Sequence, residues 1–81
     1  MQIKVKLFAI LREITGQNEI NLEVSSEISC GEILSRLQEG NPSLFPLLER
    51  CFVALNGRYV DKEVIVSEED EVAVLPPVSG G

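Results

Sequence analysis

The sequence predicts an α+β fold in which one mixed β-sheet packs against one main helix. Three observations predict it: two segments near the start that alternate between apolar and polar residues, one amphipathic segment with helix-capping signals, and several short apolar segments after it. The predicted strands are not all joined by helices, which distinguishes this order from a doubly wound parallel sheet. With 81 residues, the chain has room for one core and little room for a deep catalytic cavity.

The first half of the chain predicts two strands and the main helix. Ile3, Val5 and Leu7 fall on one face of the first strand, with lysines between them. Ser29, followed three residues later by Glu32, fits a capping box at the start of the helix. The predicted elements are a strand over residues 3–8, a short helical turn over 9–14, a polar turn over 15–18, a strand over 19–24 and a helix over 30–40.

The second half predicts a short helical segment and the remaining strands. Pro46 fits this helical segment only near the start of a helix. The dipeptide Asn56-Gly57 is the strongest short-range signal for a β-hairpin. The predicted elements are a short helix or turn over residues 42–50, strands over 52–55 and 58–60, a brief strand or connection over 64–66, a polar turn over 67–70 and a last strand over 71–75.

Residues 76–81 follow the last predicted strand as a tail. A ubiquitin-like β-grasp domain over residues 1–75 satisfies the order of elements, and Pro76-Pro77 favours an extended conformation that directs the tail away from the sheet. Gly80 and Gly81 add nothing to folding, but their lack of a Cβ atom lets them enter a narrow channel on another protein. Six extended residues reach on the order of 20 Å. The alternative is a frayed end without function.

The chemistry of such a tail centres on the carboxylate of Gly81. A free carboxylate is a poor electrophile, and formation of an acyl-adenylate with ATP activates it for attack by a sulfur nucleophile, which leaves a thiocarboxylate. The sequence has no phosphate-binding glycine loop and no histidine, so we expect no bound cofactor or metal, and ATP must be used in trans by an activating enzyme.

Composition and charge limit the classes of partner and the cellular compartment that we expect. The net charge of −6 disfavours nucleic acid and favours a protein partner with a basic surface. No apolar run approaches the about 20 residues that cross a bilayer, and no secretory signal is recognisable, so we expect a cytoplasmic protein with no membrane partner. Cys30 and Cys51 are predicted to be buried, unpaired residues of a reducing compartment.

Three segments resemble one protein family, the small sulfur-carrying subunit of molybdopterin synthase. They are residues 8–13 (Phe-Ala-Ile-Leu-Arg-Glu), 53–57 (Val-Ala-Leu-Asn-Gly) and 70–81, of which the final Pro-Pro-Val-Ser-Gly-Gly is the most specific. The resemblance covers the whole chain. The sequence departs from the common pattern at residues 68–70, where the turn before the last strand has no glycine.

The resemblance implies a ubiquitin-like sulfur carrier rather than a catalyst. An E1-like enzyme would adenylate Gly81 and convert it to a thiocarboxylate. The tail, with Gly80 as its slim neighbour, would then enter the large synthase subunit. There the sulfur would pass to cyclic pyranopterin monophosphate during molybdenum cofactor biosynthesis. The family also implies a heterotetramer of two small and two large subunits, with the catalytic groups on the large subunit.

Strand alternation places candidate partner-binding residues outside the core. If Val72 and Val74 face the core, Leu75 faces outward, and Phe8 does so at the end of the first strand, so the two can share an exposed apolar patch. The predicted partner-binding residues are Phe8, Arg12, Tyr59, Leu75, Pro76, Pro77, Val78 and Ser79. The alternatives are that Phe8 packs beneath a loop, that Leu75 caps the edge of the core, and that Arg12 is a solvated charge.

Other functions remain open on the sequence alone. The same Gly-Gly ending suits a sulfur carrier for thiamine or tRNA thiolation, or a ubiquitin-like modifier joined to lysines through Gly81. It also suits an interaction domain with an inert tail. A free-standing enzyme is disfavoured because the sequence lacks histidine and a nucleotide-binding loop.

Overall fold

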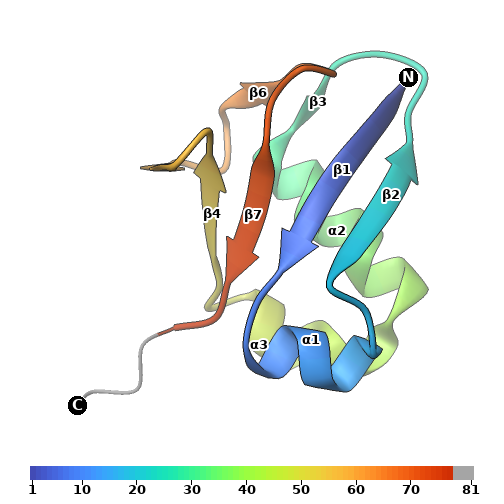
Figure 1. Ribbon diagram of the computed structural model, residues 1–81, viewed down its shortest axis with the longest axis vertical. Coiled ribbons are helices and arrows are strands. Elements are labelled where there is room, and N and C mark those ends of the chain that lie inside the picture. The colour runs from blue at the N-terminus through green and yellow to red at the C-terminus, as the bar shows by residue number, and fades with distance from the viewer. Residues whose placement is uncertain (78–81) are drawn as a thin grey trace.

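A five-stranded sheet in the order β2-β1-β7-β4-β5 forms one layer of the protein, in a computed structural model that describes residues 1–77 (Figure 1). Strands β1 and β7 pair in parallel, and the other neighbours are antiparallel. The helix α2 crosses one face of the sheet and forms the second layer, which confirms the predicted α+β fold. These elements are β1 (Gln2–Leu7), β2 (Glu19–Glu23), α2 (Cys30–Gly40), β4 (Phe52–Leu55), β5 (Arg58–Val60) and β7 (Val72–Leu75).

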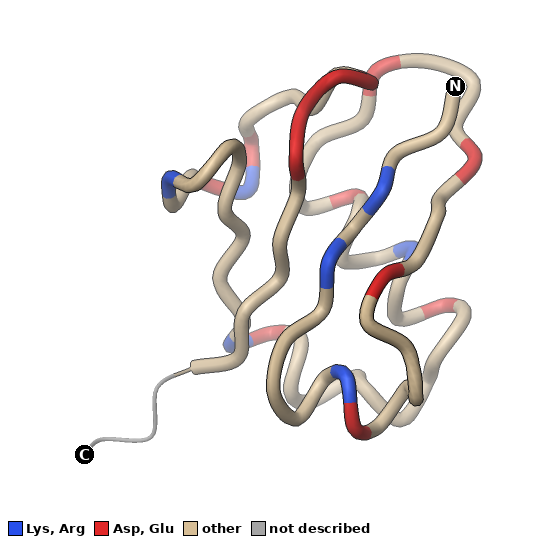
Figure 2. The backbone as a smooth tube through the Cα atoms, viewed as in Figure 1, with Lys and Arg blue, Asp and Glu red and all other residues tan. Residues whose placement is uncertain are grey.

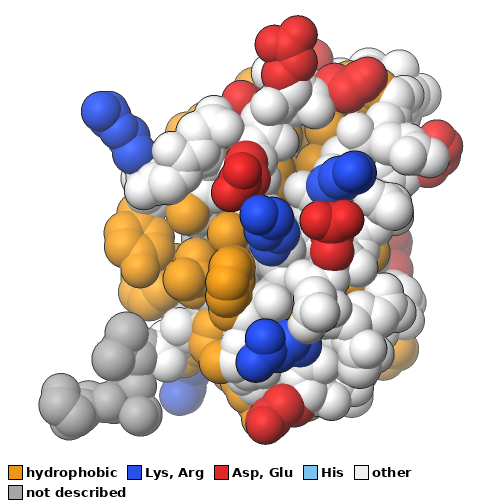
Figure 3. Space-filling model, viewed as in Figure 1, with side chains coloured by type: hydrophobic (Ala, Val, Ile, Leu, Met, Phe, Trp, Pro, Cys, Tyr) orange, Lys and Arg blue, Asp and Glu red, His pale blue; other side chains and the backbone are white. Residues whose placement is uncertain are grey.

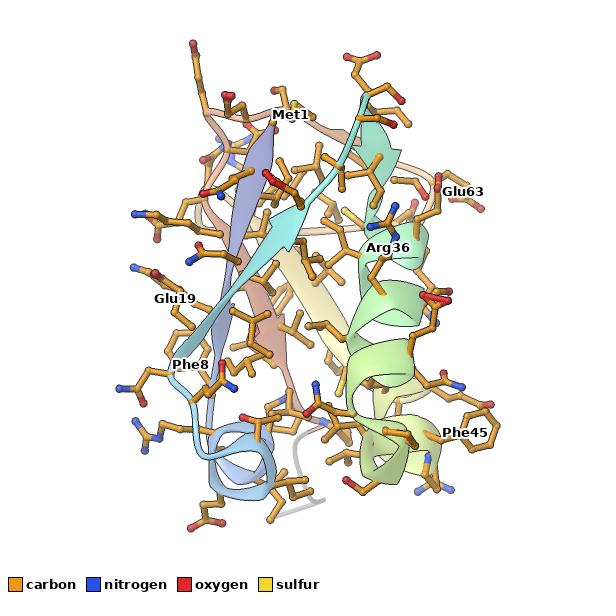
Figure 4. All side chains as sticks on the ribbon, turned by 90° about the vertical axis from the view of Figure 1, so that its right-hand side faces the viewer. Met1, Phe8, Glu19, Arg36, Phe45 and Glu63 are labelled. Atoms are coloured by element: carbon orange, nitrogen blue, oxygen red, sulfur yellow. The ribbon has the colours of Figure 1, made fainter. Side chains whose placement is uncertain are left out.

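The core lies between the sheet and α2, and apolar side chains from both layers fill it (Figure 4). Ile3, Val5 and Leu7 of β1 are at most 2% exposed, as their alternation predicts. Val72 and Val74 of β7 are fully buried beside them. No polar or charged side chain is buried within residues 1–77, so burial of apolar surface is the main source of stability.

Helix α2 begins with the predicted capping box. The backbone N–H of Glu32 donates to Ser29 Oγ at 3.2 Å, and the backbone N–H of Ser29 donates to Glu32 Oε1 at 3.4 Å. Behind the cap, Cys30, Ile33 and Leu37 form a buried stripe against the sheet. The cap thus fixes where the helix starts, and the stripe fixes which face it turns to the core.

Three short helical segments close one end of the core (Figure 1). Each contributes one fully or almost fully buried leucine, Leu11, Leu44 or Leu48. Pro46 lies in the first turn of its helix, as predicted, where its missing N–H removes no helical hydrogen bond. The segments are α1 (Ile10–Thr15), the 3₁₀ helix η1 (Pro42–Leu44) and α3 (Phe45–Leu48).

A second sheet of two strands differs from the prediction. Strand β3 (Ile28–Ser29) pairs antiparallel with β6 (Ile65–Val66). The sequence predicted only a brief strand or connection near β6, and it predicted no strand between residue 24 and α2. Two residues are too few to show alternation, and the pairing joins segments that lie far apart in the sequence.

The β4–β5 hairpin and the turn before β7 are held together by side-chain hydrogen bonds. Asn56 and Gly57 have φ angles of 52° and 86°, as the predicted two-residue hairpin requires. Asn56 Nδ2 donates to Asp70 Oδ1 at 3.0 Å, and the backbone N–H of Ser67 donates to Asp70 Oδ2 at 2.9 Å. The turn over residues 67–70 therefore closes without a glycine because Asp70 accepts these bonds.

Asp70 makes the stability of the domain depend on pH. The hydrogen bond from the Ser67 backbone, and next the one from the Asn56 side chain, lower the pKa of the Asp70 carboxyl. A carboxyl whose pKa is lower in the folded chain stabilises the fold above its unfolded pKa, about 4. This contribution is lost as the pH falls through the folded pKa.

We therefore expect Asp70→Asn to lower the free energy of unfolding modestly at neutral pH, and the difference from the wild type to shrink in acid. Urea unfolding at a series of pH values measures this. Glu69→Gln, in the same turn, serves as the control for loss of one negative charge. A deficit of Asp70→Asn that is equal at pH 7 and in acid would contradict the assignment.

Candidate functional site

An apolar hollow lies on the outer face of the sheet, on the side away from α2, near the end where β1 and β7 finish. Figure 3 shows apolar side chains gathered on this face over β7 and its neighbours β4 and β5. We call this feature the apolar hollow and define it by its lining residues, Phe8, Ala9, Phe52, Tyr59, Leu75, Pro76 and Pro77.

Strand register brings three lining side chains together. Phe52 on β4 and Leu75 on β7 are direct partners in the antiparallel ladder, next to the buried pair Val53 and Val74. Because side chains alternate along a strand, Phe52 and Leu75 point away from the core. Tyr59 on β5 then meets Phe52 edge-on, with ring centroids 5.7 Å apart and an interplanar angle of 61°. The hollow is thus built from side chains that alternate with the core residues and point to the opposite face of the sheet.

The aromatic residues of the hollow are exposed to solvent. Phe8 is 42%, Phe52 50% and Tyr59 70% exposed, whereas Leu75 is half-buried. The exposure of Phe8 argues against the alternative that it packs beneath a loop. A cluster of exposed aromatic side chains rimmed by charge is typical of a protein-binding surface.

Charged residues occupy the other half of the same face. Figure 2 shows two basic positions on β1, which are Lys4 and Lys6. Both lysines are exposed, and Lys6 Nζ lies 3.5 Å from Glu71 Oε1. Figure 3 shows these charges beside the apolar side chains rather than among them. Such a boundary between an apolar area and charges favours one orientation of a docking partner.

The structure brings five of the predicted partner-binding residues together and separates one. Arg12 is exposed on α1 and does not line the apolar hollow. The five residues that line it are Phe8, Tyr59, Leu75, Pro76 and Pro77. The remaining predicted site residues, Val78, Ser79, Gly80 and Gly81, lie outside the described residues.

Two lining residues were not predicted from the sequence. Phe52 was recognised as part of a strand, and its alternation with Val53 and Leu55, both buried, was the signal that places it on the outer face. Ala9 was assigned to a helical turn, whereas it precedes α1 with a positive φ of 52°. Nothing in the local sequence indicates that conformation, because alanine seldom adopts it.

Other side chains offer no chemistry of their own at this site. Cys30 and Cys51 are buried and unpaired, as predicted, and burial raises the pKa of both thiols, which disfavours the reactive thiolate. Within residues 1–77, no three His, Cys, Asp or Glu side chains are grouped to hold a metal ion. None of the helices in that part of the chain is long and apolar enough to span a membrane.

Sequence comparison places the chain beside sulfur carriers. The family model described as the ThiS family matches residues 5–81. A protein from Chlamydomonas reinhardtii is 40% identical over 84 residues, with all of both chains covered. One from Arabidopsis thaliana is 38% identical, covering 100% of this chain and 84% of its own. One from Homo sapiens is 31% identical, covering 99% and 94%. All three are named molybdopterin synthase sulfur carrier subunit.

Solved structures show the same fold. SAMP1 from Haloferax volcanii is 29% identical with a TM-score of 0.84, and all of both chains are covered. A protein–protein complex of subunits 1 and 2 of molybdopterin-converting factor from Helicobacter pylori 26695 contains a chain 27% identical to this one, with a TM-score of 0.70 and full coverage of both. The first neighbour is a modifier by name, and the second is a subunit of a complex.

Proposed function

Since this chain belongs to the ThiS family, we propose that it is the sulfur-carrier subunit of a molybdopterin synthase, and that the carboxylate of Gly81 carries the sulfur as a thiocarboxylate. Family membership confirms the resemblance predicted from the sequence, and the solved neighbours confirm the predicted β-grasp fold. The observation that carries the proposal is the match of 40% identity over all of both chains to a relative with this name.

The proposed chemistry begins at an activating enzyme of the E1 type. The Gly81 carboxylate attacks the α-phosphate of ATP and releases pyrophosphate, which gives an acyl-adenylate. A sulfur nucleophile at the oxidation level of sulfide (HS⁻) then attacks the acyl carbon, and AMP leaves with the bonding electrons. The product is a thiocarboxylate at Gly81, while all ATP chemistry takes place on the partner.

The second half of the cycle takes place on the large synthase subunit. The sulfur of the thiocarboxylate attacks cyclic pyranopterin monophosphate and forms a thioester between Gly81 and the pterin. Water then hydrolyses the acyl–sulfur bond, which leaves the sulfur on the pterin and restores the Gly81 carboxylate for another round. The two cysteines of the carrier are buried, and its sequence has no histidine to act as a general base. The catalytic groups therefore belong to the partners in this proposal.

In this proposal, the folded domain provides the surface that binds the partner protein. Pro76 and Pro77 line the apolar hollow, and in the sequence they stand four residues before Gly80 and Gly81 respectively. Two consecutive prolines restrict the backbone and lower the entropy lost when a tail is held in a channel. A partner that covers Phe8 and Leu75 would thus receive the tail at the rim of the same interface.

The proposed partners are the large synthase subunit and the activating enzyme. The solved complex of subunits 1 and 2 of molybdopterin-converting factor, whose matched chain has the same fold, supports the first, and a heterotetramer of two small and two large subunits is part of the proposal. Arg12, exposed on α1, is a candidate for an ion pair at the edge of either interface. We place these reactions in the cytoplasm, where the free thiols of Cys30 and Cys51 stay reduced.

A second candidate function is protein modification. The likeness to SAMP1, a small archaeal modifier protein by name, favours it. In that case the activated Gly81 would form an isopeptide bond with a lysine of a target protein. Sulfur delivery to thiamine or tRNA would use the same thiocarboxylate with another acceptor.

Intact-mass measurement of the protein from its native host tests the proposal. We expect a fraction of the chain to gain the mass of one sulfur-for-oxygen exchange, located at Gly81 by fragmentation. Higher-mass conjugates that contain peptides of other proteins would favour the modifier instead. An unmodified chain from cells that actively make molybdenum cofactor would contradict both functions.

A further inference from the structure

Ala9 has a backbone conformation that is costly for any residue with a side chain. Its φ and ψ angles are 52° and −127°, a region that glycine occupies readily and alanine does not. Within residues 1–77, the other non-glycine residue with positive φ is Asn56. Asparagine tolerates such angles, and the Asn56 side chain is held by hydrogen bonds to Asp70 and to the backbone of Glu71. Ala9 has no such compensation.

The strain at Ala9 comes from a tight connection between two buried anchors. Leu7 ends β1 and Leu11 begins the buried side of α1, and both are at most 2% exposed. The backbone N–H of Leu11 donates to the Phe8 carbonyl at 3.1 Å and closes a turn over residues 8–11. A positive φ at the first central position with ψ near −120° defines a type II′ turn, where glycine is the usual residue. This turn ends β1 one residue earlier than predicted.

The same turn shapes the apolar hollow. Ala9 lines it together with Phe8, Pro76 and Pro77. Strands β1 and β7 pair in parallel up to Leu7 and Val74, and the turn begins at Phe8, directly after this pairing ends. The turn therefore keeps Phe8 and Ala9 near Pro76 and Pro77, which follow β7.

We propose that Ala9 is a positioning residue for partner docking, whose methyl group forms one wall of the apolar hollow and whose turn holds Phe8 beside the segment that leads to Gly81. Glycine would satisfy the turn without strain, but it would remove that wall and free the backbone next to Phe8. Alanine thus lowers the stability of the domain and strengthens binding. This inference rests on the proposed function, because the docking partner is the large synthase subunit.

The substitution Ala9→Gly in the full chain tests the inference through two opposite effects. We expect the melting temperature to rise by roughly 2–4 °C, because relief of the strain exceeds the entropy that glycine adds to the unfolded chain. We expect the Kd for the large synthase subunit to weaken by roughly 4- to 10-fold, from the lost methyl contact and the looser Phe8. Calorimetric unfolding and isothermal titration with the large subunit measure the two effects.

The control is Ala9→Ser, which keeps the Cβ atom and the strained angles. We expect its Kd to stay within about two-fold of the wild type, with no rise in melting temperature. A more stable Ala9→Gly that binds as tightly as the wild type would overturn the inference, and so would a less stable one. If the wild type itself does not bind the large subunit, the proposed function fails and the inference fails with it.

Discussion

Removal of Gly81 is expected to abolish sulfur transfer while the folded domain stays unchanged. The deletion moves the terminal carboxylate back by one residue, about 3.5 Å. Misplacement of a reacting group by even 1 Å can cost on the order of 100-fold in rate, so we expect a loss of at least this size. The core and the apolar hollow are built within residues 1–77, so thermal unfolding should be the same as that of the wild type. Sulfuration of cyclic pyranopterin monophosphate and a melting curve measure the two outcomes.

A variant of the same length distinguishes the effect of the carboxylate's position from the effect of side-chain size at the last residue. Gly81→Ala keeps the carboxylate at its place in the sequence and adds one Cβ atom, so we expect a smaller loss, of roughly 10-fold, if the tail enters a narrow channel. Sulfur transfer at the wild-type rate by the chain that ends at Gly80 would show that the Gly81 carboxylate is not the carrier group. A clear fall in melting temperature on the same deletion would contradict the expectation that the stability of the folded domain does not depend on Gly81.

The substitution Phe8→Glu should disrupt docking to the large synthase subunit. Phe8 lines the apolar hollow and is 42% exposed, so the core does not depend on it. A partner that covers Phe8 would have to bury an unpaired carboxylate in the variant, in place of an aromatic side chain. Loss of a central aromatic contact alone costs on the order of 2 kcal/mol or more. We therefore expect the Kd to weaken by at least about 30-fold.

The chain offers a matched control for this substitution in Phe45. Phe45 is 48% exposed, and it lies on α3, on the opposite side of the domain from Phe8 in Figure 4. Phe45→Glu changes the net charge by the same amount and should leave the Kd unchanged. Equal weakening by both variants would point to long-range charge repulsion, and unchanged binding of Phe8→Glu would remove the hollow from the docking surface.

Local signals in the sequence were sufficient for the main elements of the fold. The alternation over β1 placed Ile3 and Val5 in the core, and both are fully buried. The capping pattern of Ser29 and Glu32 located the start of α2, and Asn56-Gly57 located the hairpin. Each signal acts between residues a few positions apart, so it can be recognised without knowledge of the rest of the chain.

The candidate site was only partly predictable because its parts come from different segments. Alternation indicated that Phe8 and Leu75 face away from the core, and it held the same information for Phe52, which was overlooked. That Phe52 and Leu75 are ladder partners follows from the pairing of β4 with β7. Such pairings are selected by the packing of the whole sheet.

The sequence by itself determined which residues of β1 and β7 face the core and where the main helix starts, because these follow from residue type and short-range spacing. The tertiary structure alone decided the pairing of β3 with β6, the bond from Asn56 to Asp70 and the strained angles of Ala9. Each of these is imposed by contacts between distant segments or by anchors buried on both sides. Local preference opposes the Ala9 conformation, and the residues on either side of the turn, Leu7 and Leu11, are both buried in the core.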